Sequence, residues 1–219
     1  MNTMPSALVI APHGMDEVLG CGGTMAGLAA AGYDVHTLVL FGDGSGRDAQ
    51  RRLAGQAAAS VLGTNAPSYS GFPENRGDTV PLAEVISAVE RLIARLRPTE
   101  IFVPHMGNLH IDHQIAHRAG LTAARPIPSL SVQSIFAYET LSSTDWSPSD
   151  LPFIPTRFVD ISATLNKKLD ALQRYSAEVR DPPHTRSFEG IHTLAKFRGY
   201  SMGLNAAEAF MVLRQIVPR

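Results

Sequence analysis

Strand-like and helical segments alternate along almost the whole chain, and this alternation limits the possible folds more than any other feature. Short apolar, β-rich runs predict strands at residues 7–12, 35–41, 101–104, 134–139, 157–161 and 210–213. Helical periodicity or small-residue runs predict helices at residues 16–31, 48–62, 82–96, 110–124, 163–178 and 188–198. Strands that alternate with helices form a mostly parallel, doubly wound α/β sheet. No repeat or linker-like tract divides the 219 residues, so we predict a single domain.

Three segments between these elements are rich in glycine, proline and polar residues. We predict them to be loops at residues 42–46, 68–80 and 140–155. Loops at the edge of a sheet commonly form the walls of a ligand pocket. Arg47, Arg76 and Arg186 are candidates to bind an anionic group on a ligand, although an arginine is by default a solvated residue.

Charge and cysteine content exclude several classes of partner. The chain has 19 Lys and Arg against 20 Asp and Glu, so it lacks the basic surface that binds nucleic acid or anionic membranes. No stretch approaches the ~20 apolar residues of a membrane span, and the first six residues do not resemble a secretory signal. Cys21 is the only cysteine, which suits a reducing compartment. We therefore predict a cytoplasmic location.

A histidine and two carboxylates follow the first predicted strand. His13 comes directly after the apolar run, and Asp16 and Glu17 open the next helix. The carboxyl end of a parallel strand is the usual place for a ligand in an open α/β sheet. Because His13 and Asp16 are three residues apart at a helix start, both can reach one divalent cation. A simpler explanation is that the acidic pair complements the helix dipole.

A second polar cluster follows the third predicted strand. His110, His113 and His117 share one face of the predicted helix, and Asp112 is close enough to orient a neighbouring imidazole. Two histidines and one carboxylate that leave a position open for water are typical of hydrolytic zinc sites and of some non-haem iron sites. The remaining histidines are expected to be surface or hydrogen-bonded residues: His36, His105 and His192.

Several glycines lie inside the first predicted helix, in the segment Gly20–Gly23. We predict that they allow this helix to pack closely against the sheet. The alternative, a nucleotide-binding glycine loop, requires G-x-G-x-x-G directly after the strand, and the segment lacks this spacing.

Three motifs occur in a fixed order along the chain. They are Pro12-His13-x-x-Asp16-Glu17-x-Leu19-Gly20-Cys21-Gly22-Gly23-Thr24, His110-x-Asp112-His113, and Arg198-Gly199 with Ala207-Glu208-Ala209-Phe210. Together they resemble the PIG-L or LmbE-like family of metal-dependent amide hydrolases. The resemblance implies a Rossmann-like α/β fold over residues 1–219 and a zinc ion, or another divalent metal such as Fe²⁺. It also implies a small-molecule substrate, an amino sugar or related amide that loses an N-acyl group such as acetyl.

The resemblance assigns three metal ligands: His13, Asp16 and His113. It assigns His110 to the oxyanion or the leaving group, and Asp112 would hold an imidazole in its working tautomer. The family's pattern has an aspartate directly before the metal-binding one, where it accepts a proton from the attacking water. This chain has Met15 there, between polar residues, where an exposed thioether would add little to folding.

Because Met15 replaces the expected base, the sequence does not decide which reaction the chain catalyses. A positioned base is typically worth ~10²–10⁴-fold in rate, and a thioether cannot replace it. A substitute would have to come from Glu17, Asp43 or His110, and we keep Glu17 as a catalytic candidate with His110 and Asp112. One alternative is a pseudoenzyme or binding subunit that retains the metal site. Another is a hydrolase of a different acyl bond, such as an ester or carbamoyl group.

Overall fold

A mixed sheet forms the centre of the computed structural model, which describes residues 4–146 and 150–217. Its seven strands lie in the order β3-β2-β1-β4-β5-β7-β6, and β7 runs antiparallel to its two neighbours. The strands are β1 (Ser6–Ala11), β2 (Asp34–Gly42), β3 (Ser68–Pro73), β4 (Glu100–Pro104), β5 (Ser134–Tyr138), β6 (Arg157–Asp160) and β7 (Ala207–Gln215). The predicted mostly parallel, doubly wound α/β fold is confirmed.

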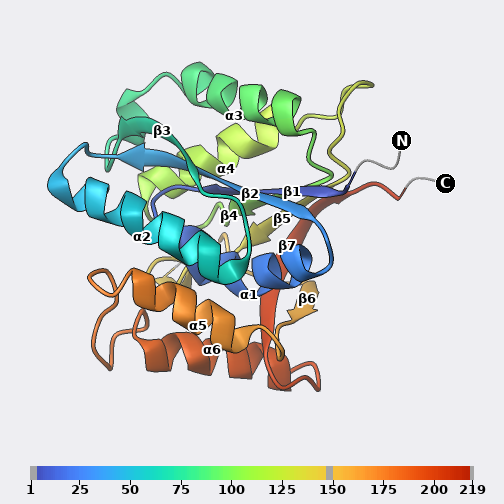
Figure 1. Ribbon diagram of the computed structural model, residues 1–219. Coiled ribbons are helices and arrows are strands. Elements are labelled where there is room, and N and C mark those ends of the chain that lie inside the picture. Colours follow the sequence, from blue (N-terminus) through green and yellow to red (C-terminus); the bar gives the residue numbers. More distant parts are fainter. Residues whose placement is uncertain (1–3, 147–149, 218–219) are drawn as a thin grey trace.

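Helices cover both faces of this sheet (Figure 1). They are α1 (Asp16–Ala30), α2 (Gly46–Leu62), α3 (Leu82–Leu96), α4 (Ile111–Ala123), α5 (Leu165–Arg174) and α6 (Phe188–Tyr200), with short 3₁₀ turns η1 (Gly77–Thr79) and η2 (Thr144–Trp146). Helices α3 and α4 lie on one face, and the other four lie on the opposite face. Within the described residues, no helix is long and apolar enough to cross a membrane.

Strand β1 is buried along its whole length because helices cover both of its faces. Ala7 and Val9 pack on the side of α1, α2 and α5, whereas Leu8 and Ile10 pack on the side of α3 and α4. A strand buried on both sides has a continuous apolar sequence, which is the pattern that residues 7–12 show.

The two polar clusters of the sequence meet where the strand order reverses. Strand β1 lies between β2 and β4, and the helices that follow β1 and β4 cover opposite faces (Figure 1). At such a switch point the loops after the two strands diverge and leave a crevice for a ligand. His13 follows β1 and His110 follows β4, so both lie at this crevice.

The segment 68–80 is more ordered than the sequence predicts. Its first six residues form β3, which pairs in parallel with β2 at the edge of the sheet. The pairing has a register shift, and Gly71 has a φ of 75°. An edge strand tolerates glycine and proline, and because these residues are also typical of loops, the sequence predicted a loop here. The loop prediction was wrong for this part.

A further difference concerns the chain segment after α5. The helix predicted over 163–178 ends at Arg174, so Glu178 lies beyond the helix. Of the predicted loop 140–155, residues 147–149 lie outside the described residues, as do residues 1–3 of the amino-terminal segment.

The glycines of α1 allow the close packing that the sequence predicts. A Cβ atom at Gly20 would lie 2.2 Å from Cδ2 of Tyr138, and one at Gly23 would lie 2.7 Å from Cγ2 of Ile161. The predicted role of these glycines in packing is confirmed. They lie inside a helix and not in a loop, so the nucleotide-loop alternative is wrong.

Candidate metal centre

The turn from β1 into α1 places His13 beside Asp16. The backbone N–H of His13 donates to Oδ2 of Asp16 (3.0 Å) and closes the turn. Met15, between them, has a φ of 92°, in the left-handed region that few non-glycine residues adopt. As a result Nδ1 of His13 lies 3.3 Å from Oδ2 of Asp16.

The start of α4 brings His110 and His113 to the same place. His110 is the N-cap, and its Nδ1 accepts the backbone N–H of Asp112 (3.2 Å). His113 follows in the first turn, with Nε2 3.3 Å from Oδ2 of Asp16. The buried Asn108 accepts the backbone N–H of His110 (2.9 Å), and its Nδ2 lies 3.0 Å from Nδ1 of His113. Asn108 therefore helps to position both histidines.

Three side chains meet with the spacing that a divalent cation requires. One ring nitrogen each of His13 and His113 and one oxygen of Asp16 lie within 4.8 Å of one another. Both nitrogens are 3.3 Å from the same oxygen of Asp16. Ligand atoms at ~2.0–2.1 Å from a tetrahedral zinc ion are roughly 3.3 Å apart, so the donor types and the two nitrogen–oxygen distances fit a divalent ion such as zinc.

Asp112 holds the ring of His13. Nε2 of His13 lies 2.8 Å from Oδ2 of Asp112, and the backbone N–H groups of Asn75 and Gly77 donate to the same carboxylate. Burial acts to raise the pKa of Asp112, but these hydrogen bonds outweigh it and lower the pKa. An ionised Asp112 accepts a hydrogen bond from Nε2–H of His13, so Nδ1 is the ring nitrogen that can offer its lone pair to a cation. His110, His13 and Asp112 form a second set of side chains that could bind a cation. The oxygens of Asp112, however, already accept hydrogen bonds from His13 and from two backbone N–H groups.

The charges around His13 favour a cation at this position. Burial alone would lower the pKa of His13, but its contacts with Asp112 and Asp16 raise the pKa to about 9. Burial would likewise raise the pKa of Asp16, but the contacts with His113 and His13 hold it well below its ordinary value. Two carboxylates thus stabilise positive charge here, and a divalent cation would supply that charge.

His110 lines the same centre as a hydrogen-bond donor. Its Nδ1 is occupied by a backbone N–H, and its Nε2 lies 2.8 Å from Oδ1 of Asn75. A neutral imidazole in this arrangement carries its proton on Nε2. Burial, with the nearby charges of His13 and His113, lowers the pKa of His110, which favours the neutral ring.

Met15 is buried, which corrects the expectation of an exposed thioether. Only 2% of its surface is exposed, and it belongs to the core cluster on the α1 side of the sheet. It is also the N-cap of α1 and makes no side-chain capping hydrogen bond. The methionine therefore gives apolar packing at a position where Ser, Thr, Asp or Asn would normally cap the helix.

Three other candidates of the sequence lie outside the centre. Glu17 is buried and accepts the hydroxyl of Tyr175 (2.7 Å), and burial raises the pKa of Glu17 to about 7. Asp43 is exposed and accepts the N–H and hydroxyl of Ser45. His117 lies 2.8 Å from the backbone carbonyl at the end of β4. None of the three lines the cavity at the centre, so the geometry does not support Glu17 or Asp43 as a base, or His117 as a ligand.

A cavity of about 300 Å³ opens onto the centre. Residues 74–75 and 140–143 contribute to its wall, so two of the three predicted loops do line the pocket. The loop 42–46 does not, although Arg47 directly after it does. Arg186 also lines the cavity, and Arg76 does not.

A charged network that the sequence did not predict forms one wall of this cavity. Arg47 donates to both carboxylate oxygens of Glu178 (2.8 and 2.6 Å). Arg51 bridges Glu178 (3.1 Å) and Glu74 (2.6 Å). The network therefore joins α2 to the segments that follow β3 and α5.

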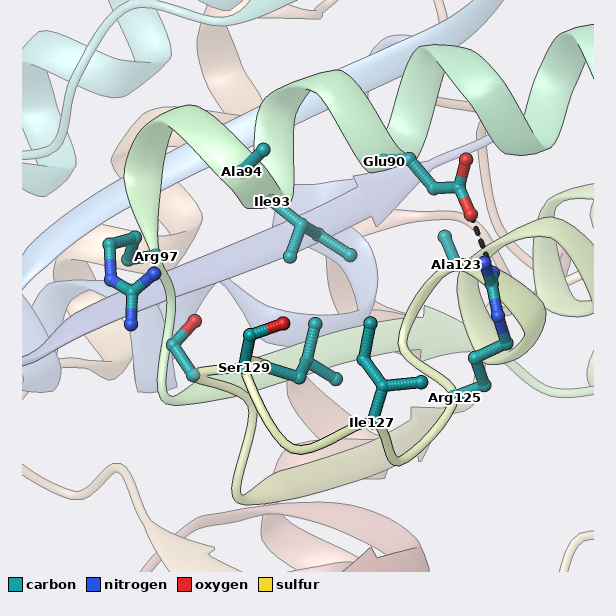
Figure 2. Close-up of a pocket in the computed structure, with 10 residues that line it drawn as sticks. Glu90, Ile93, Ala94, Arg97, Ala123, Arg125, Ile127 and Ser129 are labelled. Atoms are coloured by element: carbon teal, nitrogen blue, oxygen red, sulfur yellow. Dashed lines mark hydrogen bonds and ion pairs between the residues drawn. The ribbon is translucent and has the colours of Figure 1, made fainter.

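A second cavity, of about 380 Å³, lies between α3 and the segment that follows α4 (Figure 2). No histidine lines it, and the carboxylate of Glu90 is paired with Arg125 (2.5 Å). The groups that can bind a metal therefore gather at the smaller cavity.

Comparisons with known proteins agree with the geometry. The model of the PIG-L family, described as GlcNAc-PI de-N-acetylase, matches residues 8–124. The chain is 29% identical over 184 residues to the Escherichia coli K12 protein described as uncharacterized deacetylase YaiS, covering 80% of this chain and 93% of that one. It is 25% identical over 226 residues to diacetylchitobiose deacetylase of Thermococcus kodakarensis, with 94% and 82% covered. The crystal structure of the conserved protein TT1542 from Thermus thermophilus matches with a TM-score of 0.79 and 27% identity, over 99% and 98% of the two chains.

The fold and the site together give the class of protein. It is an α/β protein with a candidate metal site of two histidines and an aspartate at the switch point of its sheet. The family model matches more than half of the chain, so this chain belongs to the PIG-L family. The relatives described above include proteins named as deacetylases.

Proposed function

We propose that the chain is a zinc-dependent hydrolase that removes an N-acyl group, such as acetyl, from an amino sugar or a related small amide. The observation that carries this proposal is the convergence of His13, Asp16 and His113 at zinc-like spacing in the cavity. Membership of the PIG-L family supports it. The names of the family and of the Thermococcus relative both point to N-acetylated amino sugars.

In this proposal each residue at the centre has one task. His13, Asp16 and His113 hold the zinc ion, which when bound acts as a Lewis acid toward water and the amide carbonyl. Asp112 binds Nε2 of His13 and so turns Nδ1 toward the place of the ion. Nε2–H of His110 donates a hydrogen bond to the carbonyl oxygen as negative charge develops there.

Proton transfer is the difficult step for this chain. In the motif that resembles the family's, Met15 stands where the family has its base. Arg51 and Arg47 hold the carboxylates Glu74 and Glu178. Without a positioned base, amide hydrolysis is expected to be ~10²–10⁴-fold slower than with one. We therefore propose a slow amidase.

The test is release of acetate by the purified, zinc-loaded chain from N-acetylglucosamine and N,N′-diacetylchitobiose. We expect release that depends on zinc, and loss of release after chelation and in His113→Ala. If zinc binds at one ion per chain and no N-acetylated sugar is hydrolysed, the proposal is wrong and the centre serves binding only.

The buried methionine favours a second candidate, hydrolysis of an ester or carbamoyl group, because a better leaving group needs less proton donation. Matched ester and amide substrates separate the two. Faster ester turnover by ~10²-fold, with the same zinc dependence, supports the second candidate, and equal rates leave it without support.

A further inference from the structure

The three arginines that line the metal cavity differ in their partners. Arg47 and Arg51 are held by the carboxylates of the wall network. For the guanidinium of Arg186, the part of the chain that the structure describes offers neither an ion pair nor a hydrogen bond to a side chain or carbonyl. Nε of Arg186 is buried and has no acceptor. A buried donor without a partner is costly, so a native protein that keeps one needs a reason for it.

Hydrogen bonds hold the backbone around Arg186. Its carbonyl accepts the N–H of Arg180 (3.2 Å), and its own N–H donates to Nδ1 of His184 (3.0 Å). The next residue, Ser187, caps α6 by accepting the N–H of Gly190 (3.0 Å). Arg186 is therefore presented by a tight turn at the start of a helix, as a residue of a preorganised site would be.

The charge of the cavity also favours an anion. Three arginines line it, and three carboxylates balance them: Asp16, Glu74 and Glu178. Two of the carboxylates are paired with Arg47 and Arg51, and the third, Asp16, together with Asp112 behind His13, balances a divalent ion at the metal centre. The charge of Arg186 is then left uncompensated, because its guanidinium is unpaired among the described residues.

We propose that Arg186 determines specificity by binding a carboxylate or phosphate group of the substrate. The proposal rests on the proposed function and narrows its substrate class to acidic N-acylated amino sugars. A guanidinium recognises either anion through paired N–H donors. The cavity volume of about 300 Å³ is at the small end for ligand sites, which suits a single sugar ring with one acidic substituent.

The test compares three ligands on the zinc-loaded chain: N-acetylglucosamine, its 6-phosphate, and N-acetylmuramic acid. Calorimetry gives the affinity of each, and acetate release gives kcat/KM. We expect at least one acidic ligand to bind ~10-fold or more tightly than the neutral sugar, since hydrogen bonds to charged groups are the stronger ones. The phosphate and carboxylate arms show which anion the site prefers.

Variants assign the preference to Arg186. We expect Arg186→Gln to bring the ratio of acidic to neutral affinity to about one, and Arg186→Lys to retain part of the preference. The matched control is Arg76→Gln, which changes an exposed arginine outside the cavity and leaves the preference intact. Equal affinities in the unchanged chain, or a preference that survives in Arg186→Gln, would overturn the proposal. Binding that depends on Arg186 without turnover would instead refute the proposed amidase alone.

Discussion

At the scale of single residues, Met15 is the position from which the reaction can be tested most directly. It lines the cavity, occupies the N-cap position of α1 without a capping hydrogen bond, and has a φ of 92°. Aspartate tolerates this backbone better than most residues and can cap the helix. We predict that Met15→Asp raises kcat for an N-acetylated sugar by ~10²–10⁴-fold, the usual value of a positioned base, measured as acetate release by the zinc-loaded chain.

The control for this change is Met15→Asn. Asparagine has nearly the same shape and the same capping ability, but it cannot act as a base. We expect its rate to stay within a few-fold of the unchanged chain. Equal gains in Met15→Asn and Met15→Asp would show that the helix start, and not proton transfer, limits the rate.

Asp112 gives a second prediction, on metal affinity. Replacement by asparagine weakens the acceptor that holds Nε2 of His13, and loss of such an outer partner typically costs 10–100-fold in affinity. We therefore expect Asp112→Asn to raise the Kd for zinc by ~10–100-fold, measured by competition with a chelator. Asp78→Asn changes an exposed carboxylate in η1 and should leave the Kd unchanged. An unaltered Kd in Asp112→Asn would remove Asp112 from the zinc site.

At the scale of elements, the contact between α1 and the sheet makes two glycines of one helix respond in opposite ways. A Cβ atom at Gly20 would lie 2.2 Å from the fully buried ring of Tyr138, whereas nothing lies within 4 Å of one at Gly27. We predict that Gly20→Ala destabilises the fold by ~1–3 kcal/mol, because the core is overpacked. Gly27→Ala should stabilise it by ~0.5–1 kcal/mol, because alanine favours the helix.

Urea unfolding of the two variants checks this prediction. If Gly20→Ala were as stable as Gly27→Ala, α1 would have room to move away from Tyr138, and its glycines would not be required for packing.

Elements with a strong period were predictable from the sequence, and elements shaped by their position in the sheet were not. The apolar run of β1 and the helical period of α3 identify both elements locally. Strand β3 was missed because its pairing with β2, rather than its own residues, makes it a strand. The helix predicted to residue 178 ends earlier, and Glu178 pairs instead with Arg47 and Arg51.

The same division holds within the candidate site. His13 and Asp16 are neighbours in sequence and follow a clear strand, so their proximity could be predicted. The partners Arg47 and Glu178 are 131 residues apart, and no local pattern pairs them. Asn108 had a weaker signal, as a polar residue two positions before the N-cap His110, and its contacts emerge only in the folded chain.

At the scale of the whole molecule, the carboxyl-terminal motif supports the site without entering the cavity. Glu208 of β7 accepts the backbone N–H groups of Gly23 and Thr24 in α1, and it pairs with Nζ of Lys168 from α5 (2.6 Å). This buried pair fixes α1, whose first residue is the proposed ligand Asp16. The centre therefore depends on residues from both ends of the chain.

The response of the whole fold to pH should depend on Glu178. The hydrogen bonds from Arg47, with those from Arg51, lower its pKa from 4.5 to about 2, against the opposing effect of burial. A group whose pKa is lowered by folding stabilises the protein above its unfolded pKa, and this contribution is lost as pH falls through the folded value. We therefore expect the unchanged chain to exceed Glu178→Gln in unfolding free energy by about 1–3 kcal/mol at pH 6–7. The difference should shrink progressively from pH 4.5 toward pH 2.

Urea unfolding between pH 7 and pH 3 measures this difference, and Glu90→Gln is the matched control. Glu90 forms an exposed ion pair with Arg125 at the second cavity, between α3 and the segment that follows α4 (Figure 2). Such surface pairs contribute only ~0–1 kcal/mol, so the control should change little across the range. If Glu178→Gln followed Glu90→Gln at every pH, the two arginines would not be held by Glu178. Arg47 would then be available, like Arg186, to bind an anion in the cavity, whereas Arg51 also pairs with Glu74.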